Sequence, residues 1–328
     1  MQKRLHQAEE MAFAGKGIDR ELAYQLAKTE GSEIYALMDA ARRVTEQYAG
    51  KHVDLCSIIN ARSGACSEDC RFCAQSAWYN TDVEHYDLLR VEPILERAKE
   101  MEQAGAHRFS LVTSGKGMSD VDLDQVLYIY EQLRVKTNLH LCASLGILTK
   151  DQLQRLWNCG VTMYHHNLET SRNFFPSICT THTYEDRIET IKAAQAVGMK
   201  VCSGGIFSMG ETIQDRIDMA FELRDLNIPS IPINILNPIA GTPMEGQPVL
   251  EPMEILKSIA IYRLILPSAY LRMAGGREGA LRNLQALCFM AGANAALVGS
   301  YLTTSGRTVA EDIQMLQDLG RNVSISKV

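Results

Sequence analysis

Three cysteines lie within one short polar segment, and their spacing suits iron chemistry. The segment reads Cys66-Ser-Glu-Asp-Cys70-Arg-Phe-Cys73 and follows an apolar run that is typical of a β-strand. Three thiolates can hold three irons of a four-iron cubane, which leaves the fourth iron without a protein ligand. That open iron can chelate the amine and the carboxylate of a methionine derivative. The segment therefore predicts a site-differentiated [4Fe–4S] cluster.

Structural zinc is the main alternative for such a segment. It needs four protein ligands, and no histidine or further cysteine lies close by in the sequence to complete the set. A chance cluster of buried thiols is a weaker explanation, because the surrounding residues are polar. The chain has 9 cysteines but no apolar stretch of an export signal, so we expect a cytoplasmic protein whose thiols stay reduced.

Apolar β-type runs alternate with amphipathic helical patterns eight times along the chain. Such alternation implies parallel strands with right-handed crossovers, and eight units in roughly 270 residues fit an α/β fold of the (β/α)₈ TIM-barrel type. An open sheet remains the alternative. We expect strands at 53–59, 108–112, 139–143, 162–167, 200–204, 230–235, 270–274 and 295–298. We expect helices at 92–104, 120–136, 149–158, 183–197, 211–226, 251–266, 277–291 and 308–319.

Capping signals support these boundaries. Thr149 with Gln152 and Thr183 with Asp186 have the spacing of a helix start, and helix ends are expected at Gly105, Gly160, Gly198 and Gly320. Residues 1–50 are expected to form a helical extension, with helices at 20–29 and 33–48, on the outside of a barrel formed by residues 51–328. Catalytic groups of such barrels lie at the carboxyl ends of the strands, which is where the cysteine segment falls.

The composition gives no sign of a nucleic-acid or membrane partner. The chain of 328 residues is 46% hydrophobic and 22% charged, with a net charge of −6, which is typical of a globular protein without a nucleic-acid or membrane partner. No apolar run approaches the roughly 20 residues that a membrane span needs.

Several further motifs resemble those of the radical S-adenosylmethionine superfamily and, within it, of the biotin synthase family. They include His166-Asn-Leu-Glu-Thr, Val201-Cys-Ser-Gly-Gly-Ile, Ala274-Gly-Gly-Arg-Glu and Cys288-Phe-Met-Ala-Gly-Ala-Asn. Together with the cysteine segment, they extend the resemblance over about residues 50–320.

The resemblance implies an enzyme, a radical S-adenosylmethionine sulfurtransferase that inserts sulfur into dethiobiotin to form biotin. By resemblance, an electron from the [4Fe–4S] cluster cleaves S-adenosylmethionine to methionine and a 5′-deoxyadenosyl radical, which takes a hydrogen from dethiobiotin. The substrate radical then attacks a sulfide of an auxiliary iron–sulfur cluster. The family also implies an electron donor such as flavodoxin or ferredoxin, and a homodimer.

The auxiliary cluster of the best-known family members is [2Fe–2S], held inside the barrel by three cysteines and an arginine. By motif, Cys142, Cys202 and Arg272 match three of those positions, but the fourth reads Ser110. A hydroxyl is a poor iron ligand beside thiolates. The departure resembles a variant group whose auxiliary cluster is larger, of the [4Fe–5S] kind, and this cluster is favoured over [2Fe–2S].

Two further cysteines could complete the auxiliary ligand set. Cys56 lies in the first strand, where an inert core thiol is the alternative, and Cys179 follows the fourth strand on the active-site side. For Arg272, contact with an anionic cluster is favoured over direct ligation of iron. Cys159 and Cys288 are expected to be core residues on helices.

The resemblance also implies ligand-binding residues at strand ends. Asn167, Glu169 and Arg187 match positions that bind S-adenosylmethionine, the last through the methionine carboxylate, with a satisfied polar network or a solvated helix face as the alternatives. The residues that match substrate-binding positions are His165, Asn234, Thr303 and Thr304. The family often has Asn where this chain has His165, and Asp where it has Glu169.

Two other functions stay open. One is a different radical enzyme of the same barrel type, such as a hydrogenase-cofactor maturase or a methylornithine-forming mutase. The other is an electron-transfer or cluster-carrier protein without catalysis. The interior Cys142, Cys202 and Arg272, with Asn234, favour sulfur insertion over the first, and a deep barrel with an open cluster iron argues against the second.

Overall fold

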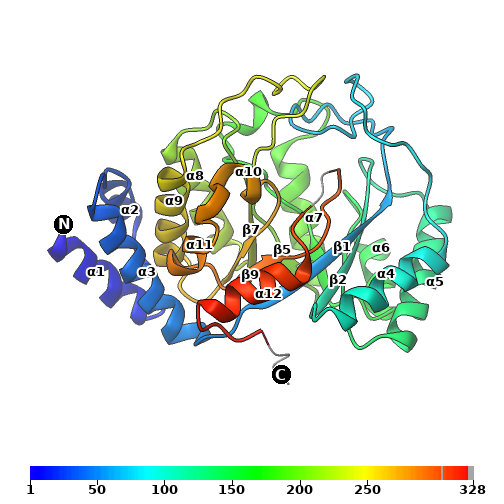
Figure 1. The fold of residues 1–328 in the computed structure, drawn as a ribbon. Coiled ribbons are helices and arrows are strands. Elements are labelled where there is room, and N and C mark those ends of the chain that lie inside the picture. Colours follow the sequence, from blue (N-terminus) through cyan, green and yellow to red (C-terminus); the bar gives the residue numbers. More distant parts are fainter. Residues whose placement is uncertain (304–305, 324–328) are drawn as a thin grey trace.

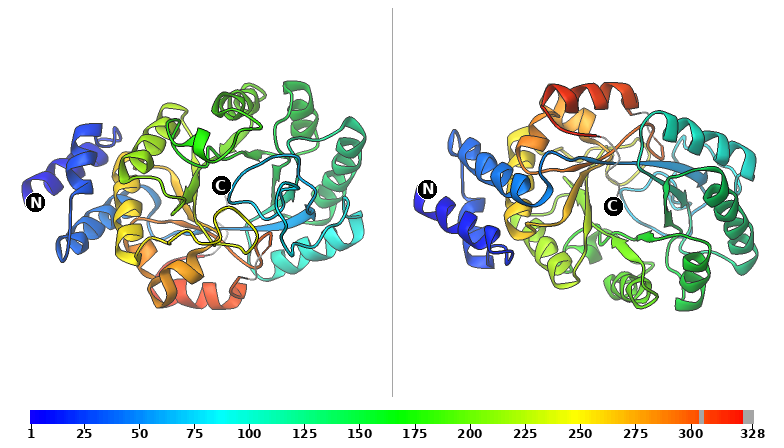
Figure 2. Two further views of the ribbon diagram at one scale, coloured as in Figure 1. Left: turned by 90° about the horizontal axis from the view of Figure 1, so that it is seen from above. Right: turned by 90° about the horizontal axis from the view of Figure 1, so that it is seen from below.

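The computed structural model describes residues 1–303 and 306–323, and its strands close into one parallel barrel (Figures 1 and 2). The strand order is β5-β4-β3-β2-β1-β9-β8-β7-β6, and pairing of β5 with β7 closes the sheet. The strands are β1 (Asp54–Arg62), β2 (Arg108–Thr113), β3 (His140–Ser144), β4 (Met163–His165), β5 (Lys200–Cys202), β6 (Gly205–Phe207), β7 (Ser230–Ile235), β8 (Tyr270–Met273) and β9 (Ala295–Leu297). The predicted α/β barrel is confirmed.

The predicted strand 200–204 ends early, at Cys202 in β5, and a separate strand, β6, follows it at Gly205–Phe207. The register pairs Cys202 with Ser230 and Gly205 with Ile233, which brings Gly204 opposite Pro232. Because proline has no N–H, the hydrogen-bond ladder is interrupted at that point. A Cβ on Gly204 would lie 2.0 Å from the Pro232 carbonyl oxygen, so only glycine permits this approach.

Helices follow the strands and surround them as a ring (Figure 2). The capping boxes at Thr149 and Thr183 are present as expected. The predicted helix 277–291 is instead broken into two short helices around a 3₁₀ turn at 282–284, where Arg282 takes a φ of 52°. The helices are α4 (Val91–Gln103), α5 (Asp120–Lys136), α6 (Lys150–Asn158), α7 (Tyr184–Ala196), α8 (Ile213–Asp225), α9 (Pro252–Ile265), α10 (Arg277–Leu281), α11 (Leu287–Met290) and α12 (Val309–Asp318).

Three helices precede the barrel: α1 (Gln2–Phe13), α2 (Arg20–Ala27) and α3 (Glu33–Ala49). They lie on the outer side of α9 (Figure 1). In α3, the Thr45 hydroxyl donates a hydrogen bond at 3.1 Å to the carbonyl of Gly292, which follows α11. The sequence did not predict α1, whose buried face consists of Leu5, Ala8 and Ala12 alone. Among the residues described, no helix has the length and apolar character needed to cross a membrane.

The parallel register brings the residues that could do chemistry to one interior surface. Cys56 pairs with Arg108 on the next strand, Ser110 pairs with Cys142, and farther round the barrel His165 pairs with Cys202. Because side chains alternate along a strand, residues two apart from these point the same way, into the barrel.

Candidate active site

A cavity of about 370 Å³ lies inside the barrel. Phe72, from the cysteine segment, lines it together with residues from the strands and the loops that follow them. Arg187, Cys179 and the three cysteines of the segment are not part of its lining, and Thr304 lies outside the described residues. The predicted site residues that line the cavity are Cys56, Cys142, Cys202, Arg272, His165, Asn167, Glu169, Asn234 and Thr303.

Three of the lining residues are buried thiols, Cys56, Cys142 and Cys202, on β1, β3 and β5. Burial raises the pKa of Cys56 to about 11 and also raises the pKa values of Cys142 and Cys202. Protonated thiols are inert, but a cationic metal centre would bind them as thiolates. Ser110, on β2 between the strands of Cys56 and Cys142, lines the same cavity and contributes only a hydroxyl.

A buried ion-pair network lies beside these thiols. The Asp54 carboxylate accepts hydrogen bonds from Arg272 and from Nε of Arg108, the latter at 3.1 Å to each oxygen. Arg272 is fixed further by hydrogen bonds from Nη1 to the backbone oxygens of Asp54, at 3.2 Å, and Ala296, at 3.1 Å. Despite the burial of Asp54, the two guanidinium groups hold the pKa of its carboxyl well below the usual range.

The donor set and the charge of this region fit an anionic cluster. Two guanidiniums and one carboxylate leave one positive charge on the network of Asp54, Arg108 and Arg272. Three thiolates bound to iron would face that excess charge, which favours an anionic group at this end of the cavity. Arg272 therefore has a protein partner in Asp54, which was not predicted from the sequence. Because Asp54 carries one negative charge and also binds Arg108, one positive charge of the two guanidiniums is left without an anion.

The cysteine segment is closed into a compact loop by its own backbone. The N–H of Cys66 donates to the Gln75 carbonyl at 3.0 Å, the N–H of Ala77 returns to the Cys66 carbonyl at 2.8 Å, and the N–H of Cys73 donates to the Cys70 carbonyl at 2.9 Å. Burial raises the pKa of Cys73 to about 11. Three thiols on one closed loop, with no fourth cysteine in that loop, fit a cubane that keeps one open iron.

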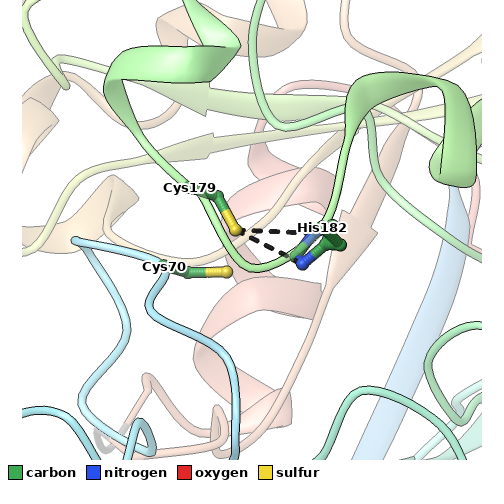
Figure 3. Close-up of side chains that lie close together, drawn as sticks. All are labelled: Cys70, Cys179 and His182. Carbon is green, nitrogen blue, oxygen red and sulfur yellow. Dashed lines mark hydrogen bonds between the residues drawn. The ribbon is translucent and has the colours of Figure 1, made fainter.

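Cys179 is not brought to the barrel thiols. It lies beside Cys70 and His182, with its sulfur 3.3 Å from Nδ1 of the histidine (Figure 3). The same sulfur lies 3.2 Å from Oδ1 of Asp69. A hydrogen bond between the two sulfurs lowers the pKa of Cys179 to about 4 and raises that of Cys70 well above its usual value. This placement separates Cys179 from Cys56, the other cysteine that the sequence suggests for the auxiliary cluster.

Asn167, Glu169 and Arg187 form one polar group at the end of β4. Arg187 reaches from α7 and donates through Nη1 to the Asn167 carbonyl at 2.8 Å, with Glu169 at 3.5 Å. Its Nε is buried and has no hydrogen-bond partner among the described residues, so this group can still donate to a bound carboxylate. Glu169 takes a φ of 69°. Its carbonyl lies so close to Gly205 that a Cβ on residue 205 would have no room.

The predicted substrate residues lie farther round the cavity. Desolvation lowers the pKa of His165 to about 4, so its ring is neutral near pH 7. The Asn234 side chain donates to the Gly205 carbonyl at 3.3 Å and accepts from the Gly275 N–H at 3.0 Å, which leaves it one further hydrogen and one lone pair for a ligand. Thr303 lines the rim and is exposed.

Comparison with known proteins identifies the family. Residues 61–223 match the Radical SAM superfamily, and residues 232–322 match the Biotin and Thiamin Synthesis associated domain. The chain is 71% identical to a biotin synthase of Heliobacterium modesticaldum, with 99% of each chain covered. It is 54% identical to a biotin synthase of Pelotomaculum thermopropionicum, over 94% of this chain and 97% of that one. The chain belongs to the biotin synthase family. It is therefore a radical S-adenosylmethionine enzyme, as the cysteine spacing and the motifs predicted.

Solved structures support the fold. Methylornithine synthase superposes with a TM-score of 0.84 at 20% identity over 97% of both chains. The hydrogenase maturase HydG gives a TM-score of 0.84 at 16% identity, over 98% of this chain and 75% of that one. At such identities the likeness extends to the barrel alone, so it lends no weight to either activity for this chain.

Proposed function

We propose that this protein inserts sulfur into dethiobiotin to form biotin, with S-adenosylmethionine as the source of the radical. The observation that carries the proposal is the pairing of two sulfur-rich sites. Cys66, Cys70 and Cys73 lie on one loop at the barrel's carboxyl end, and Cys56, Cys142 and Cys202 line the cavity within. A radical enzyme that only rearranges or transfers electrons has no need of the second set.

The residues of the loop would hold the [4Fe–4S] cluster, which supplies the electron that cleaves S-adenosylmethionine when both are bound. Arg187 has a buried Nε with a free proton and would bind the methionine carboxylate. Asn167 and Glu169 lie on the cavity wall beside it and would orient the ribose. Phe72 lines the same cavity and would help to exclude water from the reacting atoms.

The barrel thiols would hold the auxiliary cluster. Ser110 replaces the thiol that the family pattern expects on β2, and Cys56 supplies one on the neighbouring strand β1. Three thiolates from Cys56, Cys142 and Cys202 suffice for three irons, so a four-iron cluster of the [4Fe–5S] kind would keep a terminal sulfide on its fourth iron. Arg272 and Arg108 would balance its charge, and Arg272, already held by Asp54, would not ligate iron.

Dethiobiotin would lie between the two clusters. Asn234 retains a donor and an acceptor for the ureido group, His165 offers a neutral ring from β4, and Thr303 lies at the rim where a carboxylate would emerge. We also propose that the chain divides at residue 50 into a helical extension and the barrel, and that it forms a homodimer. The protein would lie in the cytoplasm and receive electrons from a donor such as flavodoxin or ferredoxin.

One anaerobic assay tests it. The reconstituted protein is mixed with reductant, S-adenosylmethionine and dethiobiotin, and both biotin and 5′-deoxyadenosine are measured. Biotin should form, and 5′-deoxyadenosine should increase with added dethiobiotin. Replacing Cys142 or Cys202 by alanine should abolish biotin while some 5′-deoxyadenosine remains. If no 5′-deoxyadenosine depends on dethiobiotin, the proposed substrate is wrong.

A further inference from the structure

A second group of metal-binding atoms lies beside the cysteine loop, apart from the barrel thiols. The sulfurs of Cys70 and Cys179 and a ring nitrogen of His182 all lie within 4.8 Å of one another, and all three residues are buried (Figure 3). Cys179 and His182 come from the loop between β4 and α7, whereas Cys70 comes from the loop after β1. None of the roles proposed above for the two clusters uses Cys179 or His182.

The spacing matches a tetrahedral metal site. Zinc lies about 2.3 Å from sulfur and about 2.0 Å from nitrogen, which places two such ligands roughly 3.5 Å apart. In the structure, the Cys179 sulfur is 3.3 Å from Nδ1 of His182 and 3.8 Å from Nε2. The donors therefore need little movement to surround one ion. Two thiolates and an imidazole favour a borderline cation such as Zn²⁺ or Fe²⁺ over Mg²⁺ or Ca²⁺.

The surrounding carboxylates orient this group. Nδ1 of His182 lies 2.5 Å from Oε2 of Glu68, so a proton on Nδ1 would be shared with that carboxylate and Nε2 would be left as the metal ligand. A carboxylate on the far nitrogen is the usual support of a metal-bound histidine. Asp69 is engaged differently: its Oδ1 accepts from the backbone N–H of Thr180 at 2.9 Å and of Thr181 at 3.2 Å. It therefore fixes the loop that carries Cys179.

We propose that, in the cluster-free protein, Cys70, Cys179 and His182 bind one Zn²⁺ or Fe²⁺ ion, with a water molecule as fourth ligand. The site shares Cys70 with the [4Fe–4S] cluster, so the two cannot be filled together. Zn²⁺ bound there delays assembly of the cluster, whereas Fe²⁺ bound there is held next to the loop where the cluster forms. The site is independent of the reaction at the auxiliary cluster.

The test is a Co²⁺ titration of the anaerobic, cluster-free, full-length chain. Co²⁺ reports tetrahedral thiolate ligation by its absorption, and Zn²⁺ should displace it because zinc binds such sites more tightly. The titration uses a background with Cys142→Ala and Cys202→Ala, which removes barrel thiols. One Co²⁺ per chain should bind. Binding should be lost in Cys179→Ala and in His182→Gln.

The cysteine loop supplies matched controls. Cys66→Ala and Cys73→Ala remove thiols of the same loop without touching the proposed site, so both should keep Co²⁺ binding. Glu68→Gln should weaken it by about 10–100-fold, as loss of a carboxylate behind a metal-bound histidine does. The opposite pattern, loss with Cys66→Ala or Cys73→Ala and retention with Cys179→Ala, would show that the loop alone binds the metal and would overturn the proposal. Absence of Co²⁺ binding in the background protein would overturn it as well.

Cluster assembly gives a second readout. Prior addition of Zn²⁺ should slow the appearance of cluster absorption during anaerobic reconstitution of the same background. In Cys179→Ala, whose three loop cysteines are intact, this delay should disappear. An equal delay in both proteins would contradict the shared use of Cys70.

Discussion

Asp54→Asn is expected to destabilise the cluster-free protein by about 3–5 kcal/mol, the usual cost of removing one partner from a buried ion pair. Asp54 is 4% exposed and Arg272 is 4% exposed, so little water can replace the lost charge. The substitution keeps the size of the side chain but leaves the guanidiniums of Arg272 and Arg108 without an anion. Their hydrogen bonds to the two carboxylate oxygens are also lost in part.

The effect should depend on pH in a defined direction. Because the pKa of Asp54 is lowered in the folded protein, its contribution to the free energy of unfolding is complete above the ordinary carboxyl pKa of about 4. It is lost as the pH falls below that value. The difference between wild type and Asp54→Asn should therefore be constant from about pH 5 to pH 8 and should shrink in more acidic buffer.

Urea unfolding of the reduced, cluster-free proteins measures the difference. Asp124→Asn is the control, since the pair of Asp124 with Arg155 is exposed and should contribute about 0–1 kcal/mol. If Asp54→Asn destabilises no more than Asp124→Asn does, the positive charges are not buried as described. In protein loaded with the auxiliary cluster, the anionic group should compensate the guanidiniums and reduce the loss.

Three further outcomes are expected. Arg187→Lys removes the Nε donor and should weaken S-adenosylmethionine binding to cluster-loaded protein by about 10–100-fold, because a hydrogen bond to a charged group contributes about 1.5–3 kcal/mol. Equilibrium dialysis measures this affinity, and an unchanged value would refute the role assigned to Arg187. Gly276→Ala should destabilise by about 1–3 kcal/mol, since its Cβ would lie 1.8 Å from the Ile235 carbonyl oxygen, whereas Gly279→Ala, with open space around it, should not. Because the pKa of His165 is near 4, this histidine should not titrate between about pH 5.5 and 8. The pH dependence of the rate of biotin formation should therefore have the same shape over that range in wild type and in His165→Asn.

The strands, the helices and the cysteine loop could be predicted because their signals are local. Each strand run and each capping pair lies within a few residues, and Cys66, Cys70 and Cys73 lie on one turn of chain. The break of the expected helix at Arg282 could not be predicted, because a positive φ at an arginine leaves no mark in the sequence pattern.

The partners of the buried charges could not be predicted for a different reason. Arg272 meets Asp54 across 218 positions of sequence, and Cys179 meets Asp69 across 110. Only the closed barrel brings the strands of the first pair and the loops of the second pair together. A sign did exist for Asp54, since an acidic residue inside an otherwise apolar strand requires a cation nearby, and Arg108 and Arg272 stand in strands of the same kind.

The proposed function depends most on an auxiliary cluster held by Cys56, Cys142 and Cys202. Iron and acid-labile sulfide in the anaerobically reconstituted triple variant Cys66→Ala, Cys70→Ala, Cys73→Ala measure that cluster alone. About four irons per chain are expected, with sulfide in excess of iron, and both should be lost when Cys56 is also replaced. About two irons with [2Fe–2S] spectra, or an iron content that is unchanged without Cys56, would contradict it.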